Sequence, residues 1–225
     1  MQNKYFGDIH DFYKYYFLKE ITKDYSLGIH WCINNYPELK NYGDKKLTQK
    51  EKNKKEELYE LLEKNRHKNV KYIKPYFPNK TKYFDKLLEN YFMDYLYEDE
   101  IIDELKTQDI IFFDPDVGIE IQSMKNAEKY KYVTYRLLVK FWNLGKSLIV
   151  YQHERGDSKK TDEKIKILYD LIKGQANIIT VKRDNVTYIC VIQGGEHYIM
   201  KDELANFRNN EKDYEVISWR ETGDI

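Results

Sequence analysis

The sequence is poor in cysteine, proline and glycine, and each shortage argues against a class of protein. Its two cysteines, Cys32 and Cys190, belong to no CxxC or Cys/His pattern, which argues against a zinc site and a disulfide framework. Both lie in apolar runs, so we expect buried free thiols in a reducing compartment. With 4 Pro and 10 Gly among 225 residues, the composition is not that of a disordered or collagen-like protein.

Long apolar runs are missing as well. No run reaches the roughly 18 apolar residues of a transmembrane helix. Residues 1–11 are polar and lack the apolar centre of a secretory signal peptide. We therefore expect a cytoplasmic protein that has no membrane partner.

The chain also lacks an excess of either charge, because 38 Lys and Arg balance 38 Asp and Glu. The two signs are nevertheless separated along the sequence. Residues 38–86 carry fifteen Lys/Arg against eight Asp/Glu, whereas residues 89–120 carry eleven Asp/Glu against one Lys. This pattern is typical either of a polyanion-binding face beside a carboxylate-rich site or of ordinary solvated helices in a Lys-rich protein.

What the sequence does contain is an alternation of apolar runs and helical periodicity. The apolar runs predict strands at residues 27–33, 70–74, 110–113, 147–151, 177–182 and 186–193. The periodicity predicts helices at residues 12–22, 48–65, 81–107, 128–144 and 162–173. Together they predict one three-layer α/β domain over residues 1–225, with a basic helical excursion at about 38–86 and a mostly parallel sheet that closes with an antiparallel β-hairpin.

The strand expected at residues 110–113 ends in Asp114-Pro115-Asp116, a turn that presents two carboxylates. Ligands of open α/β sheets bind beyond the carboxyl ends of the strands. Two acids at such a place cost electrostatic free energy unless a cation or a hydrogen-bond donor meets them. We therefore expect the active or binding site at this turn, with a plain Asx-type turn as the alternative.

Two further polar clusters could join this turn. The N-terminal cluster consists of Asp8, His10, Asp11 and Lys14, and the strand expected at residues 147–151 ends in Tyr151-Gln152-His153-Glu154-Arg155. The bland alternatives are that Asp8 or Asp11 caps a helix and that His153 is a solvated loop histidine.

These three clusters resemble the shared motifs of a family of uncharacterised bacterial and phage proteins. The family pattern is GDxxDxxKY, DPDxG and YQH, which corresponds here to residues 7–15, 114–118 and 151–153. The resemblance spans most of the chain and implies no established activity. A role in phage defence is an expectation that rests only on the proteins with which such families are associated.

More remotely, the order of motifs is similar to that of the 23S rRNA adenine-N6 methyltransferases. Those enzymes begin with a segment ending in Asp-Val-Leu-Lys-His that folds over the cofactor, have a central strand ending in Asp-Pro-Pro-Tyr, and close with a β-hairpin. Residues 11–15 and 114–117 match the first two features in part. The resemblance implies a Rossmann-like, methyltransferase-type sheet, S-adenosylmethionine as the cofactor, and a nucleic acid or nucleotide as the substrate.

The same resemblance implies roles for individual residues. Asp114 would accept a hydrogen bond from the exocyclic amine of a flipped base. Beyond the resemblance, we expect Asp114, Asp116, His153 and Lys14 to be catalytic and Asp8, His10, Asp11 and Tyr151 to bind the cofactor.

Two alternatives remain open on the residues alone, including whether the protein is an enzyme at all. Asp116 stands where the methyltransferases have their second proline, and carboxylates are the ligands that Mg²⁺ prefers. Asp114, Asp116 and Glu120 would then hold Mg²⁺ in a metal-dependent nuclease or phosphodiesterase. The other alternative is a non-catalytic module that binds a nucleotide or a protein, in which the 22 Tyr would supply stacking or interface area.

Overall fold

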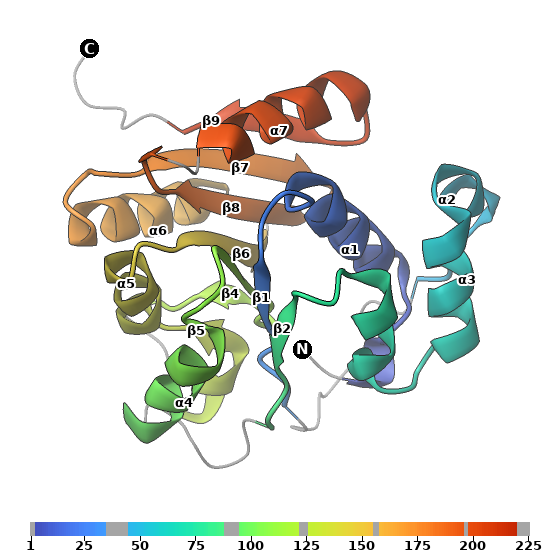
Figure 1. The fold of residues 1–225 in the computed structure, drawn as a ribbon, viewed down its shortest axis with the longest axis horizontal. Coiled ribbons are helices and arrows are strands. Elements are labelled where there is room, and N and C mark those ends of the chain that lie inside the picture. Colours follow the sequence, from blue (N-terminus) through green and yellow to red (C-terminus); the bar gives the residue numbers. More distant parts are fainter. Residues whose placement is uncertain are drawn as a thin grey trace.

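The computed structural model describes residues 3–34, 45–87, 95–121, 126–154, 158–195 and 198–219. A seven-stranded sheet runs through the molecule, and helices cover both of its faces (Figure 1). Its strands are β1 (Leu27–His30), β2 (Lys82–Phe84), β3 (Ile110–Phe113), β6 (Ser147–His153), β7 (Asn177–Arg183), β8 (Val186–Ile192) and β9 (Glu215–Ser218). A separate two-stranded sheet pairs β4 (Gly118–Ile119) with β5 (Tyr132–Val133).

The order of strands in the large sheet is β2-β1-β3-β6-β8-β7-β9. The first four run parallel, whereas β8 is antiparallel to both β6 and β7, and β9 is antiparallel to β7. The expected α/β fold with a mostly parallel sheet is therefore confirmed, and β7 and β8 form the antiparallel hairpin. This arrangement is compatible with a Rossmann-like fold.

The register of the central strands aligns their carboxyl ends. His30 of β1 pairs with Phe113 of β3, and Phe113 pairs with Val150 of β6. The residues that follow β1 and β3, and the last residues of β6, consequently lie along one edge of the sheet. We call this the carboxyl edge.

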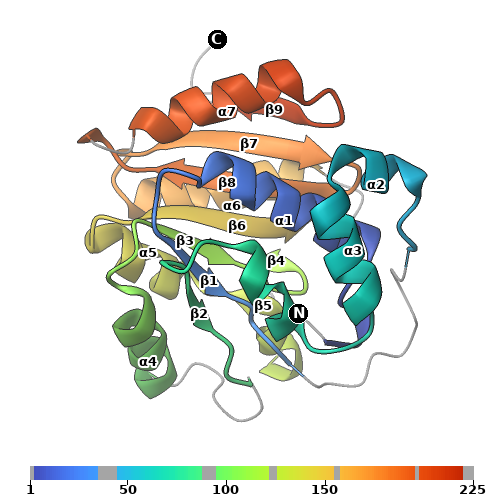
Figure 2. The same cartoon turned by 45° about the vertical axis from the view of Figure 1, so that its right-hand side comes forward.

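Two helical layers enclose the sheet (Figures 1 and 2). The α-helices are α1 (Ile9–Ile21), α2 (Gln49–Lys54), α3 (Glu56–Asn65), α4 (Tyr95–Leu105), α5 (Tyr135–Asn143), α6 (Ser158–Leu171) and α7 (Tyr198–Asn210), and the 3-10 helices are η1 (Asn3–Tyr5), η2 (Val70–Tyr76) and η3 (Asn126–Lys131). The core of one face gathers side chains of α1, α3 and α7, and that of the other face those of α4, α5 and α6. Strand β3 shows the alternation of side chains that serves both cores, since Phe112 packs in the first and Phe113 in the second.

Local capping fixes where several helices begin. The Asp8 side chain accepts a hydrogen bond from the Asp11 N–H, which makes Asp8 the N-cap of α1. Thr48 and Glu51 form a capping box at the start of α2. Of these caps, Asp8 was one of the two candidates that the sequence offered for its helix.

Several predicted elements were wrong in type or extent. Residues 70–74 form the 3-10 helix η2 instead of a strand, and the single helix expected at 48–65 is broken at Lys55 into α2 and α3. The helix expected at 81–107 contains β2 at its start and α4 at its end, and residues 88–94 lie outside the description. The predicted helical excursion at 38–86 therefore includes a strand of the main sheet, because β2 pairs with β1.

The helix expected at 128–144 is also shorter than predicted, because η3 and β5 precede α5. Elements of two or three residues carry too little sequence to show a period, so their type depends on the strand or helix beside them. In the described ranges no helix is long and apolar enough to cross a membrane.

The central position of β3 leads to a prediction about stability. Phe112 is fully buried between β1 and β6, so Phe112→Ala should lower the free energy of unfolding by about 3–5 kcal/mol. Ile217→Ala on the edge strand β9, where the side chain is 39% exposed, should cost less than about 1 kcal/mol. Urea unfolding of both variants measures the difference, and equal losses would contradict the central place of β3.

Candidate functional site

The first and second motifs meet in a buried ion-pair cluster at the carboxyl edge. The Lys14 Nζ lies 2.8 Å from Asp114 Oδ2 and 2.7 Å from Asp11 Oδ1. All three side chains are at most 5% exposed. The first turns of α1 therefore lie against the end of β3, and the lysine joins segments that are 100 residues apart in the sequence.

The backbone before α1 is shaped to complete this cluster. Gly7 has a φ of 94°, and a Cβ at this position would come within 3.0 Å of the Leu62 carbonyl oxygen and the Arg66 Cα. The Gly7 N–H donates a 2.9 Å hydrogen bond to Asp11 Oδ2. Gly7 thus gives Asp11 a second partner besides Lys14, while Asp8 caps the helix.

Lys14 shares this buried cluster with the carboxyl groups of Asp11 and Asp114, and Asp8 adjoins Asp11. Burial, with the neighbouring Asp11 carboxyl, raises the pKa of Asp8 to about 8. Burial also raises the pKa of Asp114, although Lys14 acts in the opposite direction. Burial would lower the pKa of Lys14, but Asp11 and Asp114 hold it well above its ordinary value. At neutral pH Lys14 is therefore charged and Asp8 is largely protonated.

The turn after β3 is tied to the segment after β1. The Asn34 Nδ2 donates a 2.9 Å hydrogen bond to Asp116 Oδ2. Asn34 is fully buried, and its Oδ1 has no hydrogen-bond partner among the residues that the structure describes. Cys32, two residues earlier, has a φ of 47°, a conformation that a residue with a side chain adopts at a cost. An unpartnered buried acceptor and a strained backbone beside Asp116 both indicate a ligand-binding place.

The third motif holds the turn in position from the other side. Gln152 accepts a 3.1 Å hydrogen bond from the Ile119 N–H and donates one of 3.1 Å to the Val117 carbonyl. Gly118 has a φ of 137°, and a Cβ there would lie 2.1 Å from Gln152 Oε1, so no other residue fits without movement. Gln152 therefore locks the backbone that carries Asp116.

Aromatic rings extend the site outward from the buried cluster. The Lys14 Nζ lies 5.3 Å from the centre of the buried Tyr151 ring, which is a cation–π contact. The ring of His153 lies 5.2 Å from that of Tyr151 and 6.3 Å from that of His10. His153, His10 and Asp116 are only partly buried, so they form the accessible side of the site.

Glu120 does not join the acids of the turn. Its Oε1 accepts a 2.7 Å hydrogen bond from the Tyr135 N–H in the first turn of α5. Within the described ranges no group of three or more His, Cys, Asp or Glu side chains is placed to hold a metal ion. The expected trio of Asp114, Asp116 and Glu120 is thus not assembled, because Glu120 is used by the helix start.

The structure also changes the roles expected for the other candidates. Asp114 and Lys14, expected to be catalytic, are buried and ion-paired with each other, so they tie the first turns of α1 to the turn after β3. Asp8 and Asp11, expected to bind the cofactor, lie in the same buried cluster. Arg155 lies outside the described residues.

Sequence reasoning missed two residues and gave a third no role. Asn34 was assigned to a loop, and Asp85 follows β2, which was expected to be helical. Gln152 was noticed only as one of several polar residues at a strand end. An acid directly after a strand of a parallel sheet would have been the clue to Asp85, but only once β2 had been recognised as a strand.

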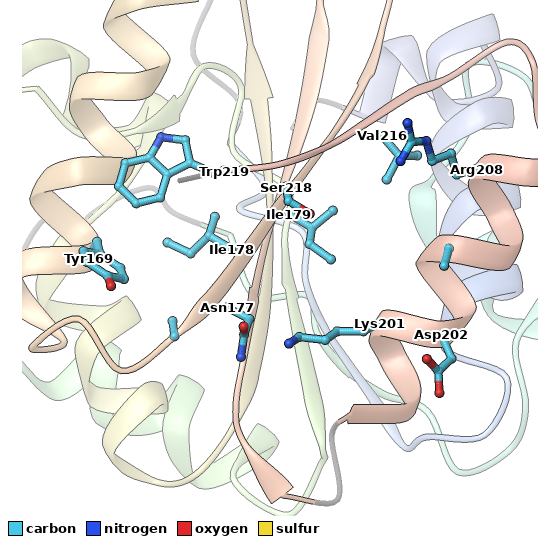
Figure 3. Close-up of a pocket in the computed structure, with 12 residues that line it drawn as sticks. Tyr169, Asn177, Ile178, Ile179, Lys201, Asp202, Arg208, Val216, Ser218 and Trp219 are labelled. Carbon is cyan, nitrogen blue, oxygen red and sulfur yellow. The ribbon is translucent and has the colours of Figure 1, made fainter. Parts of the chain in front are cut away.

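A cavity of about 640 Å³ lies elsewhere in the molecule (Figure 3). Its lining comes from the start of β7 at Asn177, from Lys201 and Arg208 of α7, and from Trp219 after β9. None of the candidate residues lines it, so it is not the site that the three motifs form.

No protein-family model matches the chain, and no curated protein or solved structure matches it either. The resemblances to the bacterial and phage family and to the methyltransferases therefore stay predictions. The site stands on its geometry alone.

The shared lysine leads to a prediction about stability. Lys14→Met should lower the free energy of unfolding by about 3–5 kcal/mol, because Asp11 and Asp114 would stay buried without their cation. Lys106→Met is the matched control, since its partner Asp103 is 73% exposed and the pair is worth less than about 1 kcal/mol. Urea unfolding measures both, and a similar small loss in the two variants would show that the cluster is not electrostatically coupled.

The raised pKa of Asp8 leads to a prediction about pH dependence. A carboxyl with a folded-state pKa of about 8 and an ordinary unfolded value stabilises the fold below about pH 4, and this contribution is lost as the pH rises toward 8. Asp8→Asn keeps an N-cap but removes the titration. Between pH 5 and 8 the native protein should therefore lose stability relative to the variant, by at most about 1.4 kcal/mol per pH unit.

Thermal unfolding of both proteins across this range measures the difference, in which the titration of the nearby His10 largely cancels. A constant difference at every pH would contradict the raised pKa.

Proposed function

We propose that the chain is a methyltransferase-like enzyme that uses S-adenosylmethionine and acts on a nucleic acid or nucleotide at the carboxyl edge. The observation that carries the proposal is the strand order. The antiparallel strand β8 is inserted between β6 and β7, and the polar turn of the DPD motif follows the strand next to β1. Placing the ligand beyond the ends of β1 and β3 agrees with the general rule for open α/β sheets.

The residues at this edge suit the chemistry of the proposed cofactor. S-adenosylmethionine presents hydrogen-bond donors on its ammonium, its ribose hydroxyls and its adenine amine. The edge offers an acceptor in the buried Asn34 Oδ1, whose lack of a partner in the described ranges is the strongest sign of fit. Asp85 adds a carboxylate directly after β2, where Rossmann folds use an acid to bind a ribose, although Lys74 already lies 2.9 Å from it.

When bound, the cofactor supplies an electrophilic methyl group. The other roles in the proposed reaction belong to residues of the chain itself. Asp116, the partly exposed acid of the turn, takes the role that the methyltransferase resemblance gave to Asp114, because the Asp114 carboxylate is already paired with Lys14. In the proposal Asp116 accepts a hydrogen bond from the substrate's amine, and the imidazole of His153 lies on the same accessible side to take up a proton.

Calorimetry with S-adenosylmethionine tests the proposal. The native protein should bind it, and Asn34→Leu should weaken binding by about tenfold or more, because the buried amide oxygen that accepts a hydrogen bond from the ligand is removed. Asp103→Asn, a change at a 73% exposed acid of α4, should leave the affinity unchanged.

The same protein titrated with Mg²⁺ separates the alternatives. A rise in melting temperature that depends on the metal and disappears in Asp116→Asn would favour a phosphodiesterase and overturn the methyltransferase proposal. Binding of neither S-adenosylmethionine nor metal would favour a non-catalytic binding module.

A further inference from the structure

Residues 64–82, which we call the basic segment, carry charge of one sign only. They contain seven Lys or Arg and no Asp or Glu, in a chain whose two charges balance overall. Four of the seven are exposed, namely Lys64, Lys68, Lys71 and Lys80. A run of this kind attracts a polyanion more strongly than a mixed surface does.

Ion pairs elsewhere on the described surface show the contrast. Lys23 pairs with Glu203, and Lys50 pairs with Asp213. The basic segment pairs with carboxylates that flank it in the described ranges, since Glu63 pairs with Arg66 and Asp85 pairs with Lys71 and Lys74. In the described ranges Lys64, Lys68 and Lys80 have no ion pair, so their charge is available to a partner molecule.

The 3-10 helix η2 sorts the side chains of the segment by a period of three. Val70, Ile73 and Tyr76 form the buried stripe, at 0%, 0% and 2% exposure. Lys71 and Lys74 form a second, basic stripe. The third stripe carries Tyr72, whose ring is 49% exposed and has the Lys68 ammonium 5.7 Å from its centre. A nucleic-acid base can stack on an exposed aromatic ring while the neighbouring cations bind its phosphates.

The segment is held rigidly beside the candidate site. The His67 N–H donates a 2.8 Å hydrogen bond to the Phe6 carbonyl, and the Val70 N–H donates one to Asn3 Oδ1. Gly7 packs against the Arg66 backbone, and Asp8 of the buried cluster follows directly in the chain. At the other end Lys74 contacts the Tyr83 ring, which stacks on Trp31 just after β1. The basic segment therefore spans the distance between two chain segments that both lead into the carboxyl edge.

We propose that the basic segment binds single-stranded nucleic acid, with its phosphates on the lysines and one base stacked on Tyr72. A single strand fits better than a duplex, because bases that are already paired and stacked have no free face for the tyrosine ring. This proposal deepens the proposed function by naming the substrate class of the same site. It rests on that function only for the direction in which the strand runs toward the carboxyl edge.

Fluorescence anisotropy with a labelled single-stranded RNA of about 16 nucleotides tests the proposal without any cofactor. The triple variant Lys64→Gln, Lys68→Gln and Lys71→Gln should bind at least about tenfold more weakly, and its plot of log affinity against log salt should be less steep by about two. The control replaces three exposed lysines of the opposite helical layer, Lys106, Lys160 and Lys166, by Gln and should bind as the native protein does.

Tyr72→Ala gives an independent signature. It should weaken binding about tenfold while leaving the salt dependence unchanged, since stacking releases no counterions. Equal weakening in the control triple variant, equal affinity for a duplex of the same length, or no binding by the native protein would overturn the proposal. If the protein binds the strand but not S-adenosylmethionine, the proposed function is wrong and this inference stands. If it binds S-adenosylmethionine but not the strand, this inference is wrong and the proposed function stands.

Discussion

The ion pair that Lys14 makes with Asp114 and Asp11 is the interaction on which the rest of the site depends. Taking two charges out of water costs several kcal/mol each, so a buried pair of this kind is weak evidence for stability. Its clearer effect is geometric, because it ties the first turns of α1 to the end of β3. Burial, with the neighbouring Asp11 carboxyl, also raises the pKa of Asp8 to about 8, which limits the negative charge that the interior holds.

With that pair in place, each of the three motifs has a definite physical role. Gly7 and Asp8 start α1, Gln152 and Gly118 fix the turn, and Asp116 is left on its partly exposed side. The buried members hold geometry, while the outer members present a carboxylate and imidazole rings. This division explains why two acids two residues apart serve different purposes. One is neutralised by Lys14 in the core, and the other is partly exposed and accepts a hydrogen bond from Asn34.

The structure also resolves the separation of charges along the chain. Two acids of the run at residues 89–120 are paired with cations, since Glu98 binds Arg136 and Lys140 while Asp103 binds Lys106. The basic half is different, since the lysines around η2 meet few acids and are anchored beside the carboxyl edge. An ordinary solvated helix describes exposed acids such as Asp103 of α4, and a polyanion-binding face remains the proposal for the basic segment.

The sequence alone determined the class of fold and predicted where the candidate site lies. Apolar runs such as residues 110–113 and 147–151 are long and uniform enough to predict buried parallel strands, and polar residues directly after them predict the edge where a ligand binds. Tertiary structure alone decided that β2 is a strand, that Lys14 meets Asp114, and that Glu120 serves a helix instead of the site. The physical reason is that pairing of a three-residue strand, and the distance between charges 100 residues apart, depend on how the layers pack, which no local pattern records.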